Sequence, residues 1–315
     1  MAENDNHMNI LEETLNKLKN VLGADNVKLN EQMRLHTTMK VGGPAALFLT
    51  PENEEGIKDA VKILEGANVP YYILGNGSNV ICKDAGYDGA IICLAGKYKG
   101  FEIINDDGET ADVTVKAGTD NKEFSDAMIR ASLAGFEFAS GIPGSIGGAT
   151  AMNAGAYDGE LKNIVTQVKL LDRSGNIITK SNEEMDFGYR HSLVSGGDYV
   201  VLETTFALKH DDRTAIQARV DDLTERRTSK QPLEYPSCGS TFKRPEGYFA
   251  GKLISDAGLK GYMLGGAQVS DKHAGFVINR DDASAADILN LIEYIKKTVQ
   301  ESQGVMLECE VKILG

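Results

Sequence analysis

The residues best suited to chemistry in this sequence lie in two glycine-rich runs. The first is Gly75-Asn-Gly-Ser-Asn79, and the second is Gly141-Ile-Pro-Gly-Ser-Ile-Gly-Gly148, which continues through Ala149 to Gly155. Because glycine has no Cβ, such a backbone can lie flush against a pyrophosphate or a flat ring and donate N–H groups to it. An ordinary turn-rich loop has the same composition, so the glycines alone leave both interpretations open.

Other common signatures of cofactor and metal sites are missing from the sequence. No GxGxxG follows a strand and opens a helix, and no GxxxxGK[ST] occurs, so neither a Rossmann domain nor a P-loop is predicted. The histidines show no HExxH spacing and the cysteines form no CxxC pair, so we expect no metal site and no disulfide framework. Each of the four cysteines, Cys82, Cys93, Cys238 and Cys309, is predicted to be a small buried hydrophobic residue.

Composition and charge narrow the class of protein. With 315 residues, 42% of them hydrophobic and 25% charged, the chain fits a globular protein of two or three domains. Its formal net charge of -13 disfavours binding to nucleic acid or to an anionic membrane, so basic residues must gather locally if the ligand is anionic. The N-terminal residues lack the pattern of a signal peptide and no window is long and apolar enough to span a membrane, so we expect a cytoplasmic location.

Periodicity places these runs in a chain of mixed α and β elements. An amphipathic helix opens the chain, and the apolar pattern predicts three units with boundaries at 1–86, 87–212 and 213–315. Asp120 and Ser284 are predicted helix caps, each with an acidic residue three positions later. The predicted helices are 54–65, 120–131, 214–230, 251–257 and one from Ser284, and the predicted strands are 46–50, 71–74, 89–94, 111–116, 165–171, 199–208, 266–269, 275–278 and 307–314.

Several motifs in the same order resemble the UDP-N-acetylenolpyruvoylglucosamine reductases, the MurB family, over residues 35–315. They include both glycine-rich runs and motifs in all three predicted units, which makes chance a poor explanation. The further motifs are Thr37-Thr-Met-Lys-Val-Gly-Gly-Pro44, Gly188-Tyr-Arg-His-Ser192, Lys230 to Pro245, Ala250-Gly-Lys-Leu-Ile254, Ala257-Gly-Leu-Lys-Gly261 and Gly304-Val-Met-Leu-Glu-Cys-Glu-Val311.

The resemblance implies an α+β fold with an FAD-binding domain of the vanillyl-alcohol-oxidase (PCMH) type, built from two α/β subdomains. A C-terminal α+β domain would bind the substrate. It also implies noncovalent FAD, NADPH as the hydride donor, and reduction of a UDP-sugar enolpyruvyl ether in bacterial cell-wall synthesis. The implied FAD-binding residues are Gly75, Asn76, Gly77, Ser78, Asn79, Gly141, Gly144, Ser145, Gly147, Gly148, Ala149, Asn153 and Gly155.

Three residues match the catalytic positions of the family. Arg190 is expected to bind the substrate carboxylate, because a planar guanidinium can bind both carboxylate oxygens as negative charge grows on them. Ser240 is the expected proton donor to the substrate α-carbon. Glu310 is expected to orient the intermediate. Glu308 would lie on the same face of the predicted strand, and only the resemblance favours Glu310 over Glu308. The expected substrate-binding residues are Tyr189, Arg244, Lys252 and Lys260.

The interval between Arg190 and Ser240 is too short for the tyrosine-bearing insertion of some family members, which indicates the shorter subtype. The diphosphate would then be held by Arg244, Lys243 or Arg227. Two other functions stay open at this stage: a flavin oxidase or dehydrogenase on the same scaffold, and a noncatalytic protein that binds FAD or a sugar nucleotide. We expect a monomer that acts on small molecules.

Overall fold

The structure is a computed structural model that describes residues 2–315, with side chains described from residue 12 onward. The chain forms two compact units. Unit 1 comprises Met1–Asn30, Leu47–Asn76 and Gly89–Thr224, and unit 2 comprises Glu31–Ala46, Gly77–Asp88 and Glu225–Gly315. The chain therefore passes from unit 1 to unit 2 inside the first glycine-rich run. Within the described residues, no helix combines the length and the apolar character needed to cross a bilayer.

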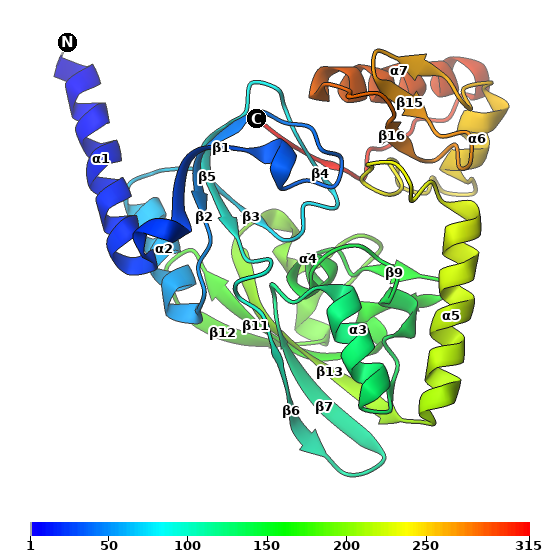
Figure 1. Cartoon of the computed structure of the whole chain (residues 1–315), viewed down its shortest axis with the longest axis horizontal. Coiled ribbons are helices and arrows are strands. Elements are labelled where there is room, and N and C mark those ends of the chain that lie inside the picture. The colour runs from blue at the N-terminus through cyan, green and yellow to red at the C-terminus, as the bar shows by residue number, and fades with distance from the viewer. Residues whose placement is uncertain (1) are drawn as a thin grey trace. The chain divides into compact units, whose positions relative to one another are not determined.

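The first part of unit 1 is a small α/β layer (Figure 1). Helix α2 (Glu54–Gly66) begins after Asn53, whose Oδ1 accepts a 2.8 Å hydrogen bond from Gly56 N, and its apolar stripe is fully buried. Strand β3 (Tyr71–Leu74) pairs in parallel with β5 (Tyr87–Cys93), and the first glycine-rich run follows β3 directly. The four-stranded sheet has the order β1-β2-β5-β3. The remaining strands of this sheet are β1 (Val27–Gln32) and β2 (Pro44–Leu49), and the layer also contains helix α1 (Ala2–Leu22).

The second part of unit 1 is an antiparallel sheet of six strands, in the order β12-β11-β13-β7-β6 with β8 on β13. Its core contains Phe124, Phe136 and Phe206, whose ring centroids lie 4.8 to 5.6 Å apart. The strands are β6 (Phe101–Asp106), β7 (Thr110–Lys116), β8 (Leu133–Ala134), β11 (Val165–Asp172), β12 (Ile177–Ser181) and β13 (Tyr199–His210), with the small pair β9 (Gly155–Ala156) and β10 (Gly159–Glu160). The helices are α3 (Asn121–Arg130), α4 (Ile146–Ala151) and α5 (Arg213–Lys230), which continues into unit 2.

Unit 2 contains a short antiparallel sheet, in the order β14-β15-β16, which packs against helix α7 (Ala285–Gln303). Ser284 caps α7 in a complete capping box with Asp287. A second, parallel pair joins the C-terminal strand β17 to β4, the strand that follows the first glycine-rich run. The remaining bounds are β4 (Val80–Cys82), α6 (Ala250–Asp256), β14 (Met263–Leu264), β15 (Ala267–Val269), β16 (Val277–Asn279) and β17 (Lys312–Leu314).

Most predicted elements are confirmed within a few residues, and β3 has the predicted bounds. The strand predicted at 307–314 is wrong over its first half, because only Lys312–Leu314 has a strand partner. The second glycine-rich run, for which no helix was predicted, contains helix α4. The opening helix extends to Ala2, and strands β1, β4, β6 and β12 were not predicted.

Candidate active site

Gly75 and Ser145 bring the two glycine-rich runs together within unit 1. A Cβ on Gly75 would lie 2.2 Å from Ser145 Oγ, so any larger residue would push that side chain aside. Ser145 is only 2% exposed, and its Oγ has no hydrogen-bond partner among the described residues. An unsatisfied buried hydroxyl costs roughly 1–3 kcal/mol. This buried hydroxyl is therefore suited to a polar group of a ligand.

The backbone of the second run is hydrogen-bonded to the segment between β7 and α3. Ile146 N donates to Thr119 O at 2.9 Å, and Gly147 N donates to Ala117 O at 2.8 Å. A Cβ on Gly147 would lie 2.7 Å from the Ala117 Cβ, so glycine is required for this packing. The N–H groups of Ile146 and Gly147 therefore bond inside the fold, and the expectation that this run offers several N–H groups to a ligand is wrong for these two.

The second half of the first run belongs to unit 2, where it lies against residues 36–38. Gly77 has φ +63°, and a Cβ there would lie 2.0 Å from His36 O. Thr38 N donates to Gly77 O at 3.1 Å. The backbone N–H groups of Gly77 and Ser78 meet no acceptor among residues 2–315. They are consequently available as donors to an anion or to a ring carbonyl.

Arg190 lies at the tip of a tight turn in unit 1. Gly188 and His191 exchange two backbone hydrogen bonds, of 3.1 and 3.2 Å, so Tyr189 and Arg190 form the turn between them. Arg190 has φ 54°, a left-handed conformation that is unfavourable for a residue with a Cβ. Its Nη1 lies 3.5 Å from Gly155 O, and its guanidinium lies 5.4 Å from the Tyr189 ring centre. An unfavourable φ at such a position is a feature of functional sites.

Asn153 supports this turn from inside unit 1. Its side chain is 2% exposed, and its Nδ2 donates to Gly188 O at 3.0 Å and to Glu160 Oε2 at 2.8 Å. The residue has φ 45°, which asparagine tolerates better than most residues. Asn153 was predicted to contact the cofactor directly, but these contacts place its amide nitrogen on the Arg190 turn.

Ser240 and Glu310 lie on two segments that meet in unit 2. A single antiparallel bridge joins Phe242 to Cys309, and Glu310 N donates to Thr241 O at 2.9 Å. Asn79 Nδ2 donates to Glu310 O at 3.2 Å, which ties this segment to the first glycine-rich run. Ser240 is exposed, and its hydroxyl makes no hydrogen bond to the described residues. Unit 2 therefore brings Ser240 and Glu310 onto neighbouring segments.

The acidic neighbour of Glu310 has a different environment. Glu308 is exposed and forms an ion pair with Lys243, and Lys243 N donates to Glu308 O at 2.9 Å. Lys243, one of the three cations expected to hold the diphosphate, is therefore already paired with a carboxylate. A second, Arg227, donates to Gln231 Oε1 at 3.4 Å.

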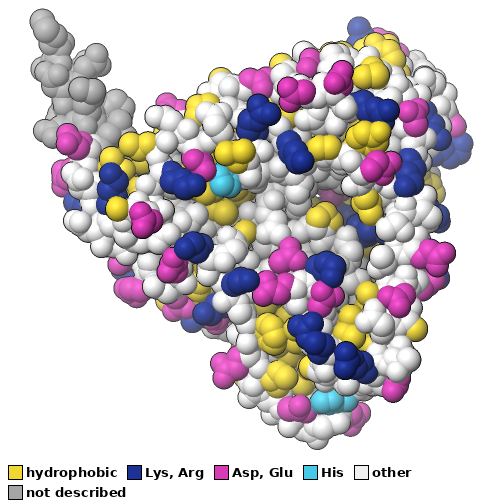
Figure 2. Space-filling view, viewed as in Figure 1, with side chains coloured by type: hydrophobic (Ala, Val, Ile, Leu, Met, Phe, Trp, Pro, Cys, Tyr) yellow, Lys and Arg dark blue, Asp and Glu magenta, His cyan; other side chains and the backbone are white. Residues whose placement is uncertain are grey.

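The other predicted substrate cations are exposed on unit 2. Arg244 stacks on the Phe249 ring at 4.1 Å, and its Nε donates to Tyr248 O at 3.4 Å. Lys252 pairs with Asp256 at 2.6 Å across one helical turn, and Lys260 is exposed. Basic side chains lie among acidic ones on the face drawn in Figure 2. Local cations therefore exist on this acidic protein, although several of them already have an acidic partner.

Three of the four thiols are buried, as predicted, whereas the prediction of burial is wrong for Cys309. Burial raises the pKa of Cys82 and of Cys93 to about 11 and that of Cys238 to about 12. A thiolate is the form that attacks an electrophile, so covalent attachment of a flavin to these thiols is disfavoured. Cys309 is half-buried, and burial raises its pKa as well. Among the described residues, no group of three or more His, Cys, Asp and Glu side chains is arranged to hold a metal ion.

Comparison with known proteins gives the class and then the family. The model of an FAD-binding domain matches residues 45–181, and the model of the C-terminal domain of UDP-N-acetylenolpyruvoylglucosamine reductase matches residues 231–314. Fold and matched domain together define an FAD-containing oxidoreductase, with the predicted α+β architecture. The chain belongs to the UDP-N-acetylenolpyruvoylglucosamine reductase family, as the following relatives show.

The relatives match almost the full length of the chain. A UDP-N-acetylenolpyruvoylglucosamine reductase of Clostridioides difficile (strain 630) is 50% identical over 95% of this chain and 96% of its own length. That of Clostridium novyi (strain NT) is 48% identical, over 95% of each chain. The crystal structure of the Thermus caldophilus enzyme superposes with a TM-score of 0.79 at 33% identity, and covers 92% of this chain and 99% of its own.

One residue near both glycine-rich runs was not predicted as part of the site. Asp120 is predicted only as a helix cap, yet its carboxylate also bonds Asn76, 44 positions earlier. No local signal in the sequence indicates a contact of this range. The capping box predicted there is also incomplete, because the Glu123 carboxylate pairs with Lys99 at 3.1 Å.

Proposed function

We propose that this protein reduces UDP-N-acetylglucosamine enolpyruvate to UDP-N-acetylmuramate with NADPH, through a noncovalently bound FAD. Membership of the reductase family supports the reaction. The observation that supports the site is the contact between Gly75 and the buried, unpaired hydroxyl of Ser145. It leaves a surface without Cβ atoms next to a polar atom that lacks a partner, as a tightly bound cofactor requires.

The residues of the two runs fit FAD in chemical character. The N–H groups of Gly77 and Ser78 are donors for its pyrophosphate or its ring carbonyls, and Ser145 Oγ can donate or accept. When bound, FAD supplies hydride transfer between NADPH and the β-carbon of the enolpyruvyl group. Gly141, Gly144, Gly147, Gly148, Ala149 and Gly155 complete the proposed cofactor surface.

Arg190 holds the substrate carboxylate. As hydride reaches the β-carbon, negative charge grows on the α-carbon and on the carboxylate, and the guanidinium stabilises it with two parallel hydrogen bonds. The turn fixed by Asn153 presents the side chain at one defined place. Such preorganisation increases the electrostatic contribution, because no reorientation is needed during the reaction.

Ser240 gives its proton to the α-carbon. A hydroxyl is a weak acid, but the carbon that it protonates is a strong base in the transition state. Its exposure on unit 2 and its lack of a hydrogen bond among residues 2–315 leave the hydroxyl free to turn toward the substrate.

Glu310 orients the substrate next to Ser240. Backbone hydrogen bonds to Thr241 and to the Asn79 side chain fix the main chain of Glu310 on both sides. Glu308 is less suited to this role, since it is exposed and paired with Lys243. The carboxylate of Glu310 would bind a donor group of the substrate or, when protonated, donate to the growing negative charge.

Exposed residues suited to a sugar nucleotide lie on each unit. Tyr189 offers an aromatic face, and Arg244, Lys252 and Lys260 offer positive charge for a diphosphate. Arg244 is the strongest candidate of the three, because the Phe249 ring supports its guanidinium and an acidic side chain pairs with Lys252. The short interval between Arg190 and Ser240 indicates the shorter subtype, in which such cations would take the place of a tyrosine-bearing insertion.

The function is tested by two measurements on the purified protein. We expect a yellow protein that releases FAD on mild denaturation, and NADPH oxidation in a 1:1 ratio with added enolpyruvyl sugar, as each turnover moves one hydride. A colourless preparation that cannot be reconstituted with FAD would remove the flavoenzyme function. FAD without NADPH turnover would indicate a binding protein, and rapid oxygen-dependent turnover would indicate an oxidase.

The remaining predictions from the sequence concern organisation. We propose the division into subdomains 1–86, 87–212 and 213–315, a cytoplasmic location and a monomeric state. Light scattering on the purified protein at several concentrations would test the last of these. A mass of twice the 34.0 kDa chain would exclude a monomer.

A further inference from the structure

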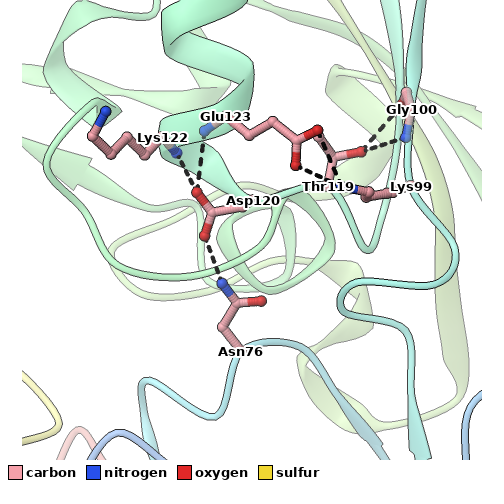
Figure 3. A network of polar contacts seen from close by, with 7 residues as sticks. All are labelled: Asn76, Lys99, Gly100, Thr119, Asp120, Lys122 and Glu123. Carbon is pink, nitrogen blue, oxygen red and sulfur yellow. Dashed lines mark hydrogen bonds and ion pairs between the residues drawn. The ribbon is translucent and has the colours of Figure 1, made fainter.

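Asp120 joins the two glycine-rich runs within unit 1 (Figure 3). Its Oδ2 accepts a 2.7 Å hydrogen bond from Asn76 Nδ2, in the first run. Its main chain forms an antiparallel bridge with Ser145, in the second run. The bridge is closed by hydrogen bonds from Asn121 N to Gly144 O at 3.0 Å and from Ile146 N to Thr119 O at 2.9 Å. One residue therefore fixes the distance between both runs.

The Asp120 carboxylate has little freedom of its own. As the N-cap of α3, its Oδ1 accepts from Lys122 N at 2.8 Å and from Glu123 N at 3.1 Å. Thr119, which is fully buried, anchors the preceding residue to Gly100 through its Oγ1. The carboxylate also occupies the first N–H groups of α3, so this helix end is not available to a phosphate.

This arrangement determines which end of the Asn76 amide faces outward. A carboxylate oxygen can only accept, so the amide nitrogen must point at Asp120 and Oδ1 must point away from it, as Figure 3 shows. Asn76 is half-buried, and its Oδ1 receives no hydrogen bond from the residues that the structure describes. The first run therefore presents a fixed acceptor.

We propose that Asp120 is a positioning residue for FAD binding. It holds Asn76 so that Oδ1 accepts a hydrogen bond from a donor group of the cofactor, a hydroxyl or a ring N–H. A phosphate oxygen is excluded as the partner, because two acceptors repel. The inference rests on the proposed function, in which the Gly75-Asn-Gly-Ser-Asn79 run contacts FAD.

The test compares three variants of the full-length protein by the FAD dissociation constant. Dilution of the FAD-bound protein, followed by flavin fluorescence, gives this constant. Asp120→Ser keeps a helix cap but cannot reach Asn76, and we expect FAD binding to weaken about tenfold, the scale of one hydrogen bond between neutral groups. Asn76→Ala should weaken it equally, and the double variant should be no weaker than either single one, since both remove the same interaction.

Asp120→Asn separates positioning from a steric role. The Oδ1 of the new asparagine stays on the α3 N–H groups, so its amide nitrogen faces Asn76. Asn76 must then turn its own Oδ1 toward position 120 and its Nδ2 outward. The outward acceptor is thereby lost. We expect the same tenfold loss from this isosteric change. Wild-type affinity in Asp120→Asn or Asp120→Ser, or additive losses in the double variant, would overturn the proposal.

A matched control excludes a general effect of stability. Asn53→Ala removes the cap of α2 in the same unit and should lower the melting temperature while leaving the FAD dissociation constant unchanged. Weaker FAD binding in Asn53→Ala, together with a lowered melting temperature in Asp120→Ser, would assign the Asp120 effect to folding and overturn the proposal. If Asn76→Ala binds FAD as the wild type does, the proposed role of the first run fails as well. If Asn76→Ala is weakened and Asp120→Ser is not, only the positioning role fails.

Discussion

The residues assigned to the cofactor and those assigned to the substrate are held in different ways. Gly75, Asn76 and Ser145 are interlocked with Asp120 by close packing and hydrogen bonds inside unit 1. By contrast, Ser240, Arg244, Lys252 and Lys260 are exposed on unit 2, and Tyr189 in unit 1 is 57% exposed. The cofactor residues are part of the packed structure, whereas most substrate residues project from it.

The difference separates the two consequences of mutation. A change at a packed glycine strains the fold itself, so stability and cofactor binding fall together. A change at an exposed functional side chain removes an interaction made only with the substrate, so activity falls while stability is kept. The first three predictions below each test one side of this comparison.

The largest effect is expected for Ser240→Ala. NADPH should still bleach the flavin absorbance, since that step needs no proton on the substrate carbon. Recovery of the absorbance on adding the enolpyruvyl sugar should slow by roughly 10²–10⁴, the usual contribution of general acid catalysis. Rapid mixing with each substrate in turn measures both rates, and Ser255→Ala, also exposed in unit 2, is the control. Equal slowing of both steps would make Ser240 a structural residue.

Gly77→Ala should cost the most stability. Alanine at φ +63° would place its Cβ 2.0 Å from His36 O, so a conformational cost and a backbone clash add to about 3 kcal/mol. Gly247→Ala is the matched control, because Gly247 has φ +75° but no atom within 4 Å of the added Cβ, and we expect about 1 kcal/mol. Denaturant unfolding measures both. Equal losses would show that the close packing at Gly77 contributes nothing.

Arg190→Lys should lower kcat about 10- to 100-fold while the melting temperature stays within a degree or two. Lysine keeps the charge but cannot form two parallel hydrogen bonds with a carboxylate. The loss of activity should appear in kcat, because the negative charge that Arg190 stabilises develops in the transition state. Arg213→Lys, at the exposed start of α5, is the control. Unchanged steady-state kinetics in Arg190→Lys would mean that Arg190 does not contact the substrate.

The smallest effect concerns alkaline pH and Cys238. Burial raises the pKa of its thiol from an ordinary value near 9 to about 12 in the folded state. Below pH 9 both states keep the proton; between pH 9 and 12 the unfolded state loses it first, so the free energy of unfolding falls as pH rises. The slope contributed is at most about 1.4 kcal/mol per pH unit. Cys238→Ala should flatten the decline between pH 9 and 10, and an unchanged decline would exclude this thiol as its source.

Local periodicity predicted the amphipathic helices well because one buried stripe and one cap define each of them. Helix α2 has both, with Asn53 at its start and Ile57, Val61 and Leu64 fully buried. Helix α7 likewise has its predicted capping box. The exposed strand β6 was missed because no residue of it is buried, so it shows no alternation. The identity of the candidate site residues also came from the sequence, through motifs that keep their order along the chain.

Tertiary structure alone decided how the segment at 307–314 is used. Its alternating sequence is compatible with one long strand, but a strand exists only where a partner supplies hydrogen bonds. Here Cys309 pairs with Phe242 and Lys312 pairs with Val80, so the chain changes partner around Glu310. Likewise, the bond between Asp120 and Asn76 depends on segments far apart in sequence, which local patterns do not encode. The sequence by itself determined the residue types and the local elements, whereas the fold decided which of those residues meet, because long-range pairing depends on the whole packed chain.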